Sequence, residues 1–105
     1  MEKSAGFVDG KHFTEYVDEV KRLRREKRND EAIGLLLRLV DATEAESIAN
    51  SCGVAPWYYE QLAICYRKLG RLDDEIRILE RFSRQPHAPG VQPPKLLARL
   101  EKLRK

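Results

Sequence analysis

Apolar residues recur at steps of three and four positions along most of the chain, the spacing that places them on one stripe of an α-helix. The first stripe runs from Phe13 to Leu23 and predicts a helix over about Gly10 to Lys27. Asn29 is then a suitable N-cap for a second helix, expected over about Asp30 to Ala49. Its leucine-rich run is too long for a strand, so the pattern predicts two successive helices here.

Two further helices are expected in the second half of the chain. Pro56 can occupy the first position of a third helix, because its missing N–H is not needed there, and this helix is expected to end at Leu69. Gly70 can adopt the left-handed conformation that ends a helix, and the acids from Asp73 to Glu75 favour the start of a fourth. The third helix is apolar around most of its circumference, which predicts a central position. The two buried stripes are Tyr59, Leu62, Ala63, Tyr66 and Leu69, and then Leu72, Ile76, Leu79 and Phe82.

The segment from Gln85 to Pro94 contains four prolines and one glycine, which excludes regular helix. Residues 85–92 are therefore predicted to be a linker before a last, leucine-striped helix that caps the core. Residues 1–9 are expected to be a flexible N-terminus and residues 10–105 a single domain. The predicted fold class is all-α, with two antiparallel helical hairpins stacked as a short right-handed array and a fifth C-terminal helix as its cap.

Length and composition limit the chain to one folded unit. Its 105 residues suffice for one modest core, and 42% hydrophobic with 35% charged residues suits amphipathic helices with solvated outer faces. No apolar stretch approaches the roughly 18 residues of a membrane span, and the N-terminus lacks the apolar block of a secretory signal. We therefore expect a cytoplasmic protein without membrane contact, in which Cys52 and Cys65 are reduced.

The second hairpin carries a spaced set of large and small residues that defines a known repeat. A large aromatic residue, Leu, a small residue and Tyr stand at fixed spacing in its first helix, followed by Gly at the turn and apolar residues in its second helix. These positions are Tyr59, Leu62, Ala63, Tyr66, Gly70, Leu72, Leu79 and Phe82. The hairpin thus resembles a tetratricopeptide repeat. Glu75 stands where the family usually has alanine, so we expect looser helix packing there.

The first hairpin is a weaker copy of the same pattern. The fitting residues are Tyr16, Val20, Leu23, Ala32, Leu36 and Leu39. Glu19 and Lys27 replace the expected Leu and Gly. Ala32 and Glu75 occupy equivalent places 43 residues apart, whereas the family period is about 34 residues. We attribute the excess, around Thr43 to Ala55, to an overlong second helix and a loop.

The resemblance implies a function in binding, because tetratricopeptide arrays bind extended peptides in a groove lined by their first helices. The segment from Gly53 to Glu60 and the C-terminal tail also resemble tetratricopeptide-like modules at the ends of longer bacterial proteins, which implies an accessory module. Carried onto this chain, the groove consists of Lys21, Arg24, Arg25, Trp57, Glu60, Ile64, Arg67 and Lys68, with Thr14 and Val17 beside them. Its basic residues suit an acidic or carboxylate-bearing peptide, since Arg pairs with carboxylates through two hydrogen bonds. The preferred hypothesis is a non-catalytic interaction module, monomeric or weakly oligomeric, with an acidic protein or peptide partner.

The uneven charge distribution leaves other partners open. Lys21 to Arg28 carries six basic residues against Glu26, and Arg84 to Lys105 six against Glu101, whereas Asp41 to Glu60 has four acids and no base. Positive charge at helix C-termini also simply complements the helix dipole. The same clusters suit the phosphates of a nucleic acid. A self-assembly scaffold that stacks through its end helices is a further alternative.

Candidate chemistry beyond binding is weak. Cys52, Cys65, His12 and His87 lack the paired spacing of a zinc site. Cys65 lies in mid-helix among apolar residues, where burial would raise its thiol pKa and make it unreactive. No nucleophile elbow, phosphate-binding loop or His-containing metal motif occurs. We therefore expect no enzyme activity, no metal and no cofactor.

Overall fold

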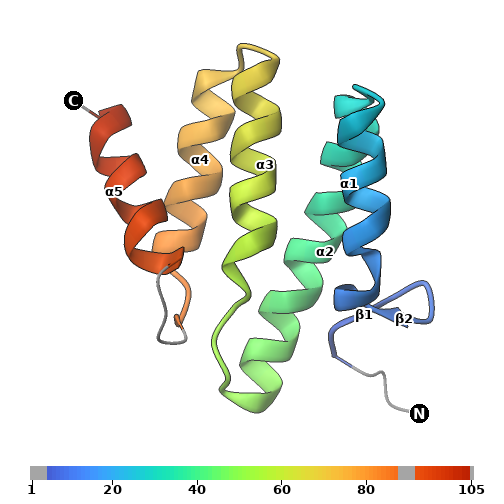
Figure 1. The fold of residues 1–105 in the computed structure, drawn as a ribbon. Coiled ribbons are helices and arrows are strands. Elements are labelled where there is room, and N and C mark those ends of the chain that lie inside the picture. The colour runs from blue at the N-terminus through green and yellow to red at the C-terminus, as the bar shows by residue number, and fades with distance from the viewer. Residues whose placement is uncertain (1–4, 88–91, 105) are drawn as a thin grey trace.

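The computed structural model describes residues 5–87 and 92–104, and within them the protein is all-α apart from one small β-hairpin (Figure 1). This confirms the predicted fold class. The elements in chain order are β1 (Phe7–Val8), β2 (Lys11–His12), the 3₁₀ turn η1 (Phe13–Tyr16), α1 (Val17–Arg25), α2 (Asn29–Asn50), α3 (Pro56–Lys68), α4 (Leu72–Ser83) and α5 (Gln92–Arg104).

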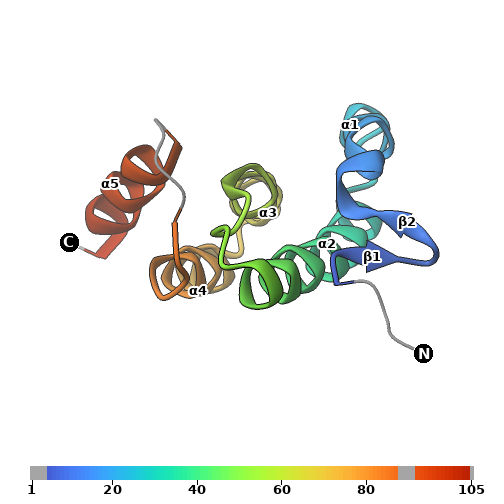
Figure 2. The same ribbon diagram turned by 90° about the horizontal axis from the view of Figure 1, so that it is seen from below.

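The helices form two layers. Figures 1 and 2 show α1, α3 and α5 running in one direction in one layer, and α2 and α4 running in the opposite direction in the other. Neighbours in sequence pack as hairpins, α1 with α2 and α3 with α4, while α3 also contacts α2 and α5. The largest fully buried apolar side chains are Tyr59, Phe82, Leu36, Leu39, Leu62 and Leu79. As predicted, α3 is the central helix.

The two hairpin turns share one backbone geometry, offset by the 43 residues expected from the sequence. The equivalent hydrogen bonds run from Arg28 N to Leu23 O (2.9 Å) and from Arg71 N to Tyr66 O (2.8 Å). The left-handed residue is Lys27 (φ 62°) in the first turn and Gly70 (φ 72°) in the second. Lys27 therefore adopts the conformation usually supplied by glycine. The excess length lies in α2, which has 22 residues against 12 in α4.

The N-terminal segment differs from its prediction. β1 and β2 pair antiparallel, and the loop residues Asp9 and Gly10 both have positive φ, 51° and 85°. Two such residues between paired strands form the type I′ turn that an Asp-Gly pair favours. The prediction of a helix from Gly10 is therefore wrong, because the chain makes this hairpin first and enters α1 through η1.

The hairpin belongs to the folded unit. Val8 is buried, and its carbonyl oxygen accepts a hydrogen bond of 2.6 Å from the Tyr16 hydroxyl. The Phe13 amide donates to Gly6 O at 2.8 Å. The expected flexible N-terminus is therefore corrected for residues 5–9, while residues 1–4 lie outside the described part of the chain.

The last helix begins earlier than its prolines suggested. α5 starts at Gln92, so Pro93 and Pro94 lie in its first turn, where missing N–H groups cost no intrahelical hydrogen bond. The predicted linker thus loses Gln92 to the helix, and its residues 88–91 lie outside the described part. Before that, the Val54 amide donates to Pro86 O at 3.0 Å, which ties the end of α4 to the loop before α3.

Glu75 is buried and bonded at the position where looser helix packing was expected. Only 1% of this residue is exposed, and its Oε2 accepts hydrogen bonds from Arg99 Nε (2.9 Å) and Nη2 (2.5 Å). The position that usually holds alanine in the repeat pattern therefore carries a buried charge that connects α4 to α5.

Candidate peptide-binding face

The structure places the eight predicted groove residues on α1 and α3, and two of them border a hollow beside α5. Arg24 on α1 reaches across to α3 and donates a short hydrogen bond from Nη1 to Gln61 Oε1. Glu60 and Arg67 line the hollow, which α3 shares with α4 and α5. We therefore distinguish an α1–α3 group, which includes Arg24, from an α3–α5 group, which consists of Glu60 and Arg67.

Arg24 is the most distinctive residue of the α1–α3 group. Its side chain is partly buried, and its Nε atom is fully buried without a hydrogen-bond partner. Its hydrogen-bond partner, Gln61, is neutral and itself 7% exposed. Among the described residues no carboxylate lies within ion-pair distance of Arg24. A partly desolvated cation without a counter-ion is a favourable place for an external anion.

Lys68 contributes a second positive charge to the same region. Burial raises the pKa of the Cys65 thiol, and the charges of Arg24 and Lys68 oppose this rise. Both cations therefore lie close enough to one buried thiol to act on it, although they come from different helices. We define the α1–α3 site by Arg24, Gln61 and Lys68, with Lys21 and Arg25 exposed on α1.

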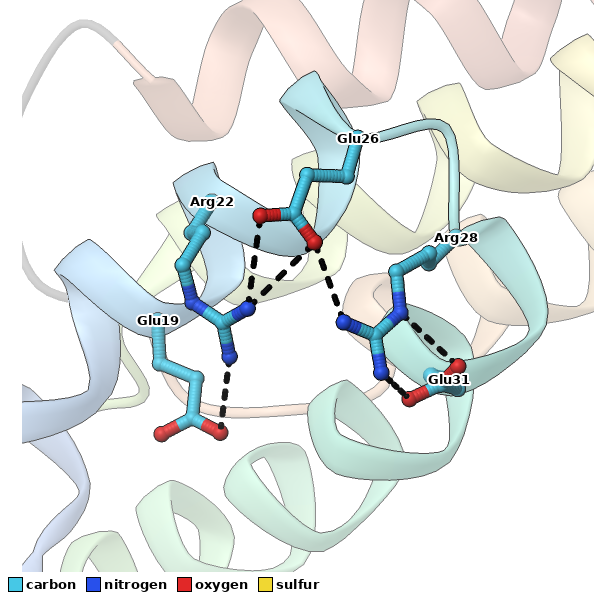
Figure 3. A network of polar contacts seen from close by, with 5 residues as sticks. All are labelled: Glu19, Arg22, Glu26, Arg28 and Glu31. Carbon is cyan, nitrogen blue, oxygen red and sulfur yellow. Dashed lines mark hydrogen bonds and ion pairs between the residues drawn. The ribbon is translucent and has the colours of Figure 1, made fainter.

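The basic run at the end of α1 is only partly available for binding. Figure 3 shows two of its arginines inside a ladder of ion pairs on the surface of the α1–α2 turn. The ladder pairs Arg22 with Glu19 (3.8 Å) and Glu26 (3.4 Å), and Arg28 with Glu26 (3.0 Å) and Glu31 (2.5 Å). Hydrogen bonds from Arg28 hold the pKa of the Glu26 and Glu31 carboxyls below the usual range.

The ladder shows which basic residues of this run are paired with acids of the same surface. Arg22 and Arg28 are paired in this way, as expected for charges whose role is to stabilise the ends of helices. Lys21, Arg24 and Arg25 take no part in the ladder, and these are the residues predicted for the groove. The alternative of purely structural charges therefore accounts for the paired arginines and leaves the α1–α3 site unexplained.

The aromatic residues at the start of α3 serve mainly in packing. Tyr58 and Tyr59 are buried, and the Tyr58 hydroxyl donates to Phe13 O at 3.2 Å. Trp57 is partly buried against the core and meets the Tyr58 ring edge-on at a centroid distance of 5.0 Å. Stacking of nucleobases on Tyr58 or Tyr59 is therefore excluded by their burial, whereas Trp57 is partly exposed.

The four candidate metal ligands have separate structural partners. His12 Nε2 lies 2.7 Å from Glu46 Oε2, and His87 Nε2 lies 2.7 Å from Phe82 O. Cys52 is exposed, whereas Cys65 is buried. No group of three or more His, Cys, Asp or Glu side chains converges on a point within residues 5–87 and 92–104.

Two residues of the site region were missed by the sequence reasoning. Gln61 is a polar residue within the apolar side of α3, and its position between Tyr58 and Cys65 along one face was the signal that could have marked it. Arg99 is one of several basic residues on the last helix, and nothing in the sequence sets it apart. Its contact with Glu75 depends on how α5 docks, which no local pattern encodes.

Searches for similar proteins do not extend this picture. None of the helices in the described part of the chain is both long and apolar enough to cross a membrane. The resemblance to tetratricopeptide repeats rests on the sequence spacing alone, because comparison of the chain with protein-family models, curated proteins and solved structures yields no match.

Proposed function

We propose that the protein is a non-catalytic interaction module that binds an acidic or carboxylate-bearing peptide segment at the α1–α3 site. The observation that carries the proposal is the state of Arg24, a partly buried guanidinium held by Gln61 with no carboxylate partner in the described chain. A peptide carboxylate at this point supplies the missing counter-charge and a charge-assisted hydrogen bond.

The surroundings of Arg24 suit an extended ligand. Lys68 adds a cation from α3, and Lys21 and Arg25 add exposed cations from α1. Trp57 and Ile64 are partly exposed apolar residues on the same central helix. Apolar anchors beside charge-assisted contacts are the combination by which helical grooves hold extended peptides.

A selection experiment tests this proposal. The immobilised protein is presented with a random peptide library after nuclease treatment, beside a variant with Lys21→Glu and Lys68→Glu. The matched control carries Arg77→Glu and Arg84→Glu, which make the same charge change at exposed positions outside the site. We expect acid-rich peptides to be enriched by the wild type and the control and to be lost with the site variant.

Two other results would contradict the proposal. Equal enrichment by the site variant and the control would show that only net charge matters. Binding of single- or double-stranded nucleic acid that weakens steeply with salt, with no peptide enriched, would favour a nucleic-acid-binding domain instead.

A further inference from the structure

The α3–α5 group of predicted residues borders a hollow that the α1–α3 site does not include. It has a volume of about 710 Å³ and lies where α5 flanks α3 and α4, as Figure 2 shows for the helices. Its size falls in the range of ligand pockets, roughly 300–1,000 Å³. The residues that matter for its chemistry are Arg67, Leu72, Glu75, Leu96, Arg99 and Leu103.

The floor of the hollow holds more positive charge than its carboxylate can satisfy. Arg99 donates two hydrogen bonds to Glu75 Oε2. Arg67 Nε lies 3.5 Å from the same oxygen, which is too far for a good hydrogen bond. Arg67 makes no side-chain hydrogen bond to any described residue, and its side chain is 57% exposed. The lining of the hollow carries four cations, Arg67, Lys95, Arg99 and Lys102, against the three carboxylates of Glu60, Glu75 and Glu101. One positive charge is therefore in excess, and Arg67 is the arginine that makes no hydrogen bond to Glu75.

The wall of the hollow is apolar. Leu72, the first residue of α4, is 51% exposed and is one of the few large hydrophobic residues at the surface of the described chain. Leu103 is partly buried and Leu96 buried on the facing side of α5. A guanidinium that is more than half exposed and only loosely paired with Glu75, beside an exposed leucine, matches a ligand that has a carboxylate next to an aliphatic group.

We propose that this hollow binds a short extended peptide stretch, with an aliphatic side chain against Leu72 and Leu103 and a carboxylate on Arg67. The inference rests on the proposed function and deepens it by adding a second subsite with its own specificity. Arg67 directly precedes Lys68, so neighbouring residues of α3 contribute to the hollow and to the α1–α3 site.

The dimensions fit a peptide of limited length. The α5 residues that border the hollow extend from Lys95 to Leu103. At a rise of about 1.5 Å per residue this wall is about 12 Å long, which corresponds to about four residues of extended chain. The ligand recognised here is therefore an aliphatic residue and an acidic residue within a four-residue stretch.

Three blocked tetrapeptides test the subsite by titration of the ¹⁵N-labelled full chain. The first probe is acetyl-Ala-Leu-Glu-Ala-amide. In the second probe Ala replaces Leu, and in the third Gln replaces Glu, which removes the carboxylate. We expect the first to bind in the hollow and each of the other two to bind about tenfold more weakly, since each lost contact is worth about that factor.

Matched variants assign the two contacts. Arg67→Gln leaves the Arg99 bonds to Glu75 in place and should abolish the preference for Glu over Gln. Leu72→Ser should abolish the preference for Leu over Ala, and Arg77→Gln, an exposed change elsewhere on α4, should alter neither. No binding of the first probe up to its solubility limit, or equal affinities of all three, would overturn the inference.

The test separates this subsite from the proposed function. The Lys21→Glu, Lys68→Glu variant should keep tetrapeptide binding in the hollow while it loses longer acidic peptides. If the tetrapeptides fail and the longer peptides still bind wild type and not this variant, the second subsite is wrong and the α1–α3 site stands. If neither class binds, both proposals fail.

Discussion

The buried pair of Glu75 and Arg99 joins α4 to α5, and its contribution to stability is measurable. The Glu75 side chain is 2% exposed and the Arg99 side chain 23%, with two hydrogen bonds between them. Removing one partner of a fully buried pair costs about 3–5 kcal/mol, because the other charge stays buried and unpaired. Here Arg67 lies 3.5 Å from the same carboxylate oxygen and offsets part of that cost. We therefore expect Arg99→Met to lower the free energy of unfolding by about 2 kcal/mol.

The control is a second ion pair between the same two helices. Arg104 lies 3.2 Å from Glu80, and these side chains are 50% and 33% exposed. Because exposed pairs contribute about 0–1 kcal/mol, Arg104→Met should change stability by less than Arg99→Met.

A double-mutant cycle isolates the pairwise contribution. Urea unfolding is followed by circular dichroism for Glu75→Gln, Arg99→Met and the combination. We expect a coupling free energy of about 1–2 kcal/mol, because the two groups are in direct contact. Equal losses for Arg99→Met and Arg104→Met, or a coupling near zero, would refute the reasoning that a buried charge holds α5 in place.

Three further predictions concern the turns, the thiols and the tyrosines. Lys27→Gly should raise the unfolding free energy by about 1 kcal/mol and Gly70→Ala should lower it by about 1 kcal/mol, because both positions have left-handed φ. Thermal unfolding measures these changes, and changes of the opposite sign would contradict the prediction. A thiol reagent should modify Cys52 quickly and Cys65 only after unfolding, since burial raises the pKa of the Cys65 thiol; two fast thiols would disprove the assignment. Burial raises the pKa of Tyr58 to about 12, so the folded state keeps a proton that the unfolded state loses near pH 10. Stability should therefore fall as the pH rises from about 10 to 12, less steeply in Tyr58→Phe, and a flat profile in urea unfolding would contradict this.

The helices could be predicted because their signals are local. The spacing of apolar residues placed α2, α3 and α4 correctly, and the internal alignment predicted the 43-residue offset that both turns display. Lys27 still takes a left-handed conformation although it is not glycine, because the chain reversal requires it. The 43-residue offset thus predicts the left-handed conformation of Lys27 by matching it to Gly70, although the residue type does not.

The errors arose where a local signal was outweighed or missed. The Asp9-Gly10 pair is a turn signal, and it outweighs the helical spacing that follows it. The prolines before α5 exclude the interior of a helix, but the first turn of a helix tolerates them. Glu75 could not be interpreted from the sequence, because its partner Arg99 comes from an element whose docking direction is a tertiary property.

The most direct test of the binding account is to map the contact surface of an acidic peptide selected from the library. In a ¹⁵N titration, the account predicts the largest shifts for the Arg24 Nε–H and the Gln61 side-chain amide, with Lys68 next to them. Arg24 Nε has no hydrogen-bond partner in the described chain, and Gln61 holds the same guanidinium through its Oε1. Shifts confined to the outer faces of α2 and α4, with Arg24 and Gln61 unchanged, would contradict it.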